Sequence, residues 1–125
     1  MKLQGVTVVK GYDLYKRVLN LLGYMYSDDS ITSDNLLYKR ALYAINQILS
    51  DLGQNEIADM NSEIKLSKPQ LDALIYGVAM LLSLIGGDGE RNRLFTNLYN
   101  AKRGAVLNRV DAVTDAMPKV DGGAI

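Results

Sequence analysis

The sequence predicts an all-α fold, a compact bundle of about four helices with a long loop after the second helix and a flexible C-terminal tail. Two observations lead to this expectation. Apolar residues recur near the helical period of about 3.6 residues in four separate stretches, and nowhere do strands and helices alternate as in a parallel sheet. The 125 residues are enough for one domain with a sizeable core.

The N-terminal residues 1–11 are expected to form an extended arm. They contain Val6-Thr7-Val8-Val9, a β-branched run bounded by glycines, which favours a short strand. No second strand is predicted. We therefore expect this strand to lie over the helices or to pair with another copy of the chain.

The first two helices are predicted from apolar periodicity and from the residues at their ends. The first covers residues 12–22 and stops at Gly23, since glycine readily adopts the left-handed conformation that ends helices. The second opens at Ser33 or Asp34, whose side chains can accept hydrogen bonds from free backbone N–H groups. It is expected to end at Gly53.

The third helix is expected to be the central element. It follows residues 54–66, where the helical period is lost, and so long a loop should either drape over the core or be ordered by a partner. The helix opens with Ser67-Lys68-Pro69-Gln70, which has the spacing of a capping box. It is apolar nearly all round and should be covered on most sides. Within it, Ala73 and Gly77 leave a low spot where a neighbouring backbone can approach.

The last helix should begin at Asp88 or Gly89 and reach at least Arg103. Two alternatives are open beyond that point: an end or bend at Gly104, or continuation of the helix through residues 105–113. The preceding Gly86-Gly87-Asp88-Gly89 resembles a phosphate-binding turn, but here it follows a helix and not a strand. A glycine helix stop joined to an aspartate helix start explains it. We assign residues 1–109 to the domain and residues 110–125, which contain Pro118 and two adjacent glycines, to a flexible tail.

Positive charge is concentrated in the last helix. Between residues 91 and 109 it carries five Lys or Arg side chains and no Asp or Glu, although the whole chain balances 14 basic against 14 acidic residues. On a helical wheel, its apolar residues form two stripes roughly 100° apart. The first stripe comprises Leu94, Leu98, Ala101 and Ala105, and the second comprises Phe95, Tyr99 and Val106.

Two apolar stripes favour a helix that packs inside its subunit on one side and against a neighbour on the other, with cations at the seam. The alternative is a single wide core face from which the long basic side chains extend to solvent. Under the first interpretation, the candidate interface residues are Arg91, Arg93, Phe95, Tyr99, Lys102, Arg103 and Arg109.

Composition excludes several classes of function. The chain has no Cys and no His, which excludes disulfides, thiolate chemistry, Cys/His zinc sites and a Ser-His-Asp triad. Adjacent Asp28 and Asp29 lie in a polar stretch and are interpreted as solvated surface. We therefore predict no catalytic residue, no cofactor and no metal. The longest uncharged run, residues 73–87, is shorter than the ~20 residues that span a bilayer, so no membrane role is expected.

Packing and turn patterns in three helices resemble those of a known family. The second helix contains Arg40-Ala41-Leu42, Ala44-Ile45-Asn46-Gln47-Ile48 and Asp51-Leu52. The third contains Leu74-Ile75-Tyr76-Gly77-Val78-Ala79-Met80-Leu81-Leu82, followed by Gly87-Asp88-Gly89-Glu90 and by residues 94–103 of the last helix. Over roughly residues 12–109, the chain thereby resembles the small helical head-tail connector proteins of tailed bacteriophages and prophages, also called adaptor or head-completion proteins.

This resemblance implies a structural subunit and not an enzyme. Such a subunit forms a ring of about a dozen copies beneath the portal protein, extends the DNA channel, and offers a docking surface for the next tail-side component. Non-specific contact with DNA in the channel is part of the expectation. The implied location is the head-tail junction of the virion, with the bacterial cytoplasm as the site of assembly. The resemblance transfers no individual site residue.

A small helical DNA-binding or regulatory protein that uses residues 91–109 as its basic helix is the alternative from another class. Zero net charge and the apolar residues threaded through this helix count against it, because surfaces that follow phosphates carry a more continuous excess of Lys and Arg. An enzyme is the third class and has the least support.

Overall fold

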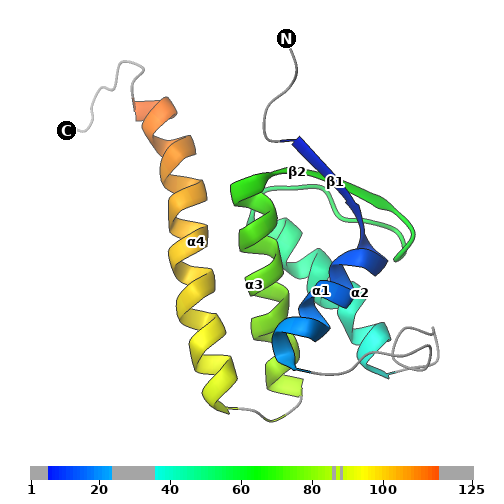
Figure 1. Cartoon of the computed structure of the whole chain (residues 1–125). Coiled ribbons are helices and arrows are strands. Elements are labelled where there is room, and N and C mark those ends of the chain that lie inside the picture. The colour runs from blue at the N-terminus through cyan, green and yellow to red at the C-terminus, as the bar shows by residue number, and fades with distance from the viewer. Residues whose placement is uncertain (1–5, 24–35, 86, 88, 116–125) are drawn as a thin grey trace.

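The computed structural model describes residues 6–23, 36–85, 87 and 89–115. Four helices account for most of this part of the chain, as the sequence predicts, and they are joined by one small two-stranded sheet (Figure 1). The elements in chain order are β1 (Val6–Lys10), α1 (Gly11–Leu22), α2 (Leu36–Asp51), β2 (Glu63–Ser67), α3 (Lys68–Ile85) and α4 (Gly89–Asp115).

The small sheet corrects the expectation of a lone N-terminal strand. β1 pairs with β2 in antiparallel register, with Val6 opposite Ser67 and Val9 opposite Ile64. β2 lies at the end of the stretch predicted to be a loop, and its side chains alternate between exposed and buried along the strand. Such alternation places one face of a strand on the core. The pairing joins segments more than fifty residues apart, which local periodicity cannot show.

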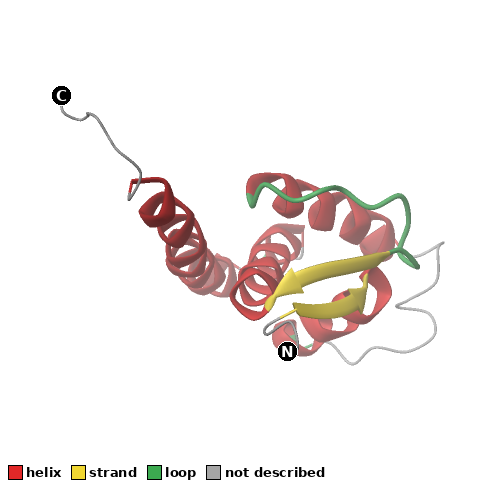
Figure 2. Ribbon diagram, turned by 90° about the horizontal axis from the view of Figure 1, so that it is seen from above, coloured by secondary structure: helices red, strands yellow, loops and turns green. Residues whose placement is uncertain are grey.

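Both strands lie across one end of the helices (Figure 2). From β1 the chain passes directly into α1, which ends at Gly23 in the left-handed conformation, with φ of 83°. The Gly23 N–H donates to the carbonyl oxygens of Asn20 and Leu19, so the predicted glycine stop is confirmed. α2 ends at Asp51, close to the predicted Gly53, while its predicted start at residues 33–34 lies outside the described residues.

The loop between α2 and β2 lies against the core, where hydrogen bonds from α1 and α2 to its backbone groups hold it. The Asn46 side chain clamps Ile57: its Nδ2 donates to the Ile57 carbonyl oxygen at 2.9 Å, and its Oδ1 accepts from the Ile57 N–H at 2.7 Å. Further along, the Tyr12 N–H donates to the Met60 carbonyl oxygen at 2.8 Å. Of the two predicted alternatives, draping over the core is the one observed.

α3 begins with the predicted capping box. The Ser67 N–H donates to Gln70 Oε1 at 3.0 Å, and the Gln70 N–H donates to Ser67 Oγ at 3.3 Å. The helix lies between α4 on one side and α1 and α2 on the other, which makes it the central element (Figure 1). Its coverage is less complete than predicted near its end, because Leu81 is only half-buried and Leu84 is 61% exposed.

Gly77 in α3 occupies the predicted point of close approach. A Cβ atom at this position would lie 2.8 Å from Ile48 Cγ2 of α2 and 2.9 Å from Tyr99 Cε1 of α4. Both distances are shorter than an ordinary van der Waals contact between carbon atoms. The space is therefore used for packing, although side chains and not a neighbouring backbone fill it.

The chain turns between α3 and α4 with Gly87 in the left-handed conformation, at φ of 73°. α4 then runs from Gly89 to Asp115, so residues 110–115, which the sequence assigns to the tail, belong to the helix. The remaining tail residues 116–125 and the predicted helix start at Asp88 lie outside the described residues. Within the described part of the chain, no helix is both long and apolar enough to cross a membrane.

Candidate interaction surface

The position of α4 at the edge of the molecule makes its outer face a candidate interaction surface. In both views α4 packs along α3 and stands apart from α1 and the sheet (Figures 1 and 2). Its inner face carries Phe95, Tyr99 and Val106, each 6% exposed or less, and the Phe95 ring stacks on Tyr76 of α3 with centroids 6.2 Å apart. Phe95 and Tyr99 therefore belong to the core and not to an external interface, which corrects the sequence prediction.

A small polar network fixes the start of α4 against the end of α3. Asn92 Nδ2 donates to the Met80 carbonyl oxygen at 2.9 Å and to Ser83 Oγ at 3.3 Å. The buried Ser83 hydroxyl itself donates to the Met80 carbonyl oxygen at 2.8 Å. These bonds satisfy polar groups that would be costly to bury alone, so they fix the register of the two helices.

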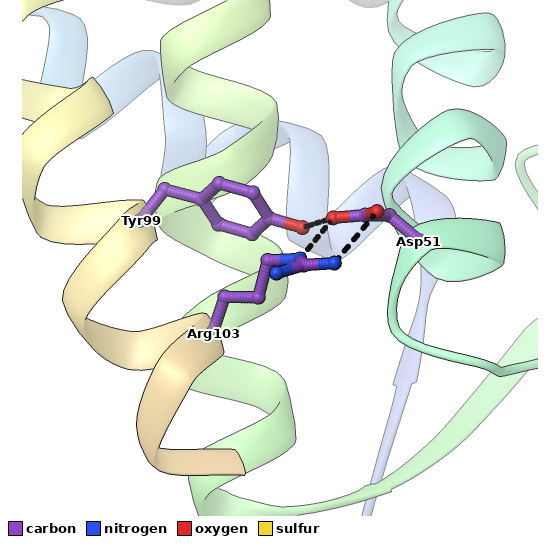
Figure 3. Close-up of polar contacts among 3 residues, drawn as sticks. All are labelled: Asp51, Tyr99 and Arg103. Carbon is purple, nitrogen blue, oxygen red and sulfur yellow. Dashed lines mark hydrogen bonds and ion pairs between the residues drawn. The ribbon is translucent and has the colours of Figure 1, made fainter. Parts of the chain in front are cut away.

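Asp51 at the end of α2 forms a second polar cluster with Tyr99 and Arg103 of α4 (Figure 3). The Tyr99 hydroxyl donates to Asp51 Oδ2. Arg103 Nε donates to the same oxygen at 2.7 Å, and Arg103 Nη2 reaches Oδ1 at 3.4 Å. The cluster ties α2 to α4 across the edge of α3. Arg103 thus has a partner within its own chain. The Asp51 carboxylate offsets its charge, so Arg103 adds less positive charge to the predicted interface.

We call this cluster the clamp, and its ionisation follows from its contacts. The hydrogen bond from Tyr99 lowers the pKa of the Asp51 carboxyl, and Arg103 lowers it further. Burial, together with the neighbouring Asp51 carboxylate, raises the pKa of the Tyr99 phenol. At neutral pH the carboxyl group is therefore ionised and the phenol protonated.

The other predicted cations occupy different positions on α4. Arg91 lies against the end of α1, where a Cβ added at Gly23 would come within 3.0 Å of its Nη1. Arg93 is exposed, Lys102 is half-buried, and the side chain of Arg109 lies outside the described residues. The structure therefore brings only part of the predicted set to the outer surface.

The outer side of α4 carries the first apolar stripe, which contains Leu94. Leu94 is 53% exposed, Leu98 is half-buried, and Ala101 and Ala105 are exposed. On the helical wheel, Lys102 lies between this stripe and the buried one, and Arg93 lies about 80° beyond the other edge, with Glu90 and Asn97 in between. We call the four apolar residues together with Arg93 and Lys102 the outer face. An open hollow of about 800 Å³ lies at its N-terminal end and is lined by Gly89, Glu90, Arg93, Leu94 and Asn97.

Comparisons with known protein families, curated proteins and solved structures find no match to this chain. The candidate surface is therefore defined by this chain's own geometry.

Two features of α4 are not contained in the sequence prediction. It did not include Leu94 among the interface candidates, although Leu94 belongs to one of the two predicted stripes, and it did not pair Asp51 with Arg103. Wheel positions alone cannot show which stripe meets α3.

Among the described residues, no group of three or more acidic side chains is placed to hold a metal ion.

Proposed function

We propose that this protein is a structural subunit of a head-tail connector ring in a tailed bacteriophage or prophage. In this proposal it docks on the portal protein, joins the portal to the tail-side component, and lines or extends the DNA channel. The subunit acts through surface contacts and performs no catalysis.

The observation that carries the proposal is the uncovered outer face of α4. Leu94 is a large apolar side chain that is more than half exposed beside three further apolar residues of the same stripe, Lys102 borders this stripe, and Arg93 lies further round the helix. An apolar centre with a charged rim is the usual composition of a protein interface. The resemblance of residues 12–109 to connector proteins supports a ring as the setting in which this face is covered.

The alternative of a small DNA-binding or regulatory protein has weaker support from the geometry. Arg103 is paired with Asp51, and Lys102 is half-buried, so a duplex would not meet the full charge of the basic helix. If all five cations contacted phosphates, log affinity would change with log salt at a slope of about −4.5. We expect duplex binding by the isolated subunit to be weak, with a slope well below that value.

Co-purification with the portal protein of a candidate phage tests the proposal. We expect native mass spectrometry to detect a complex of several subunits with the portal ring, and electron microscopy to show added density beneath it. A tight, strongly salt-dependent complex with duplex DNA, formed without any portal binding, would favour the alternative instead.

A matched pair of variants tests the role of the outer face. Leu94→Asp places a charge in the centre of the apolar stripe, whereas Gln47→Asp adds the same charge at an exposed position of α2. Leu94→Asp should abolish assembly with the portal ring, and Gln47→Asp should leave it intact. Equal assembly by both variants would remove α4 from the proposal.

A further inference from the structure

Two surfaces of opposite charge lie on different elements of this molecule, one on α4 and the other on the loop between α2 and β2. We propose that the outer face of α4 binds the acidic segment 54–63 of a second copy of the chain. This inference rests on the proposed function, since it names the contact between neighbouring ring subunits, but its test requires only the purified chain.

The acidic segment carries three carboxylates and no cation. Glu56, Asp59 and Glu63 are all exposed, and no Lys or Arg occurs between residues 52 and 64. Asp59 is used locally, because its Oδ1 accepts from the Asn61 N–H at 2.8 Å. Neither Glu56 nor Glu63 forms an ion pair with another described residue. Two carboxylates on this segment are therefore available to an incoming cation.

The shape of the segment is set before any partner arrives. The Asn46 amide holds both backbone groups of Ile57, and the Gly11 N–H donates to the Ser62 carbonyl oxygen at 3.2 Å. A surface that is already ordered loses little conformational entropy when it binds. An open hollow of about 220 Å³ between this loop and β2 is lined in part by Glu56, Glu63 and Lys65, so both carboxylates border one depression that also holds one cation.

The outer face of α4 offers the complementary charge. Arg93 and Lys102 are its two cations, and neither forms an ion pair with another described residue. Glu90, in the first turn, is the only acidic residue between positions 89 and 110. Two outer faces would repel each other through these cations, whereas an outer face and an acidic segment attract.

The placement of the two surfaces makes the contact head-to-tail. α4 lies along one side of the molecule, and the loop that contains the acidic segment begins near α4 and runs away from it to the start of β2 on the far side (Figures 1 and 2). A contact between two different surfaces of identical subunits repeats from copy to copy, and it closes into a ring when the rotation per subunit divides a full turn. Each copy then supplies one outer face and one acidic segment.

Charge reversal in two separate variants tests the inference by sedimentation velocity and native mass spectrometry. One variant carries Arg93→Glu and Lys102→Glu, and the other carries Glu56→Lys and Glu63→Lys. Each alone should self-associate ~10-fold or more weakly than the wild type, because like charges then face each other. An equimolar mixture should recover assembly, since the acidic α4 of the first meets the basic segment of the second, and the basic α4 of the second meets the acidic segment of the first.

A control variant and a folding check keep the result interpretable. Lys39→Glu with Arg40→Glu reverses two exposed cations on α2 and should leave self-association unchanged. Thermal unfolding of every variant shows whether the subunit is folded, and recovery in the mixture shows it independently.

Three outcomes would overturn the inference: a wild-type chain that stays monomeric at every concentration reached, reversals on α4 that leave association unchanged, or a mixture of folded variants that does not reassemble. Portal binding by a chain that never self-associates would leave the proposed function standing while this contact fails. Recovery in the mixture without portal binding would establish the contact and count against the connector role.

Discussion

Three leucines near the end of α3 allow the packing of this helix to be tested with one chemical change. Leu82 is 0% exposed, Leu81 is half-buried, and Leu84 is 61% exposed, although all three lie within four consecutive positions. Replacing each by Ala removes three carbon atoms from the side chain. The free energy of unfolding should therefore fall in the order of their burial.

The magnitudes follow from the burial of the removed atoms. Three fully buried carbons at ~0.8 kcal/mol each give ~2.4 kcal/mol for Leu82→Ala, and the cavity left behind raises the loss to about 3 to 5 kcal/mol. At Leu84 about 40% of the side chain is buried, so the same transfer term is ~1 kcal/mol, with no enclosed cavity. Leu81→Ala should fall between these values, which is a smaller effect than the all-round apolar character of the helix suggests.

Equilibrium urea unfolding at 25 °C measures these differences, provided that the slope m stays constant among the variants. A difference of ~2 kcal/mol between Leu82→Ala and Leu84→Ala is well above the usual uncertainty of such measurements. A loss at Leu84 equal to or greater than that at Leu82 would refute the assignment of α3 as the central helix. It would also mean that its exposed side contributes to folding.

Three further predictions concern single polar groups. Because the pKa of Asp51 is lowered in the folded protein, its clamp should stabilise the fold above the unfolded pKa of about 3.9 and lose this effect as pH falls through the folded pKa. The difference in unfolding free energy between wild type and Asp51→Asn should therefore vanish in acid. Burial raises the pKa of Tyr15 from 10.0 to about 12, so the protonated phenol stabilises the fold below pH 10 and this contribution is lost as pH rises to about 12. In alkaline unfolding, Tyr15→Phe should therefore resist high pH better than the wild type, and an unchanged midpoint would show that Tyr15 does not control it. Finally, Ser67→Ala should cost ~1 kcal/mol by removing the side-chain acceptor of the capping box, whereas Ser50→Ala at an exposed position of α2 should cost much less in the same urea assay.

Local patterns in the sequence predicted the helices because their ends are determined by nearby residues. Gly23 takes the left-handed conformation that ends α1, and Ser67 and Gln70, three positions apart, exchange hydrogen bonds at the start of α3. Both helix ends depend on interactions within one helical turn. Gly77 was predictable for another reason, because a residue without a side chain lets neighbouring helices approach closely, although only the fold shows that Ile48 and Tyr99 fill the space.

The candidate surface was less predictable, because it depends on which groups meet across the fold. Two stripes on α4 were visible in the sequence, but only the packing of α4 on α3 places Phe95 and Tyr99 inside and Leu94 outside. The partner of Arg103 lies 52 positions away at Asp51, and no periodicity connects them.

The sequence by itself determined the class of the fold, the positions of most helix ends and the absence of Cys- and His-based chemistry. Only the tertiary structure decided that β1 joins β2, that Arg103 belongs to a clamp with Asp51, and that the stripe of α4 that contains Leu94 is the exposed one. The physical reason is the range of the interactions concerned. Capping and helical periodicity act between residues a few positions apart, whereas strand pairing, ion pairs between helices and burial depend on contacts between distant segments that the folded chain alone brings together.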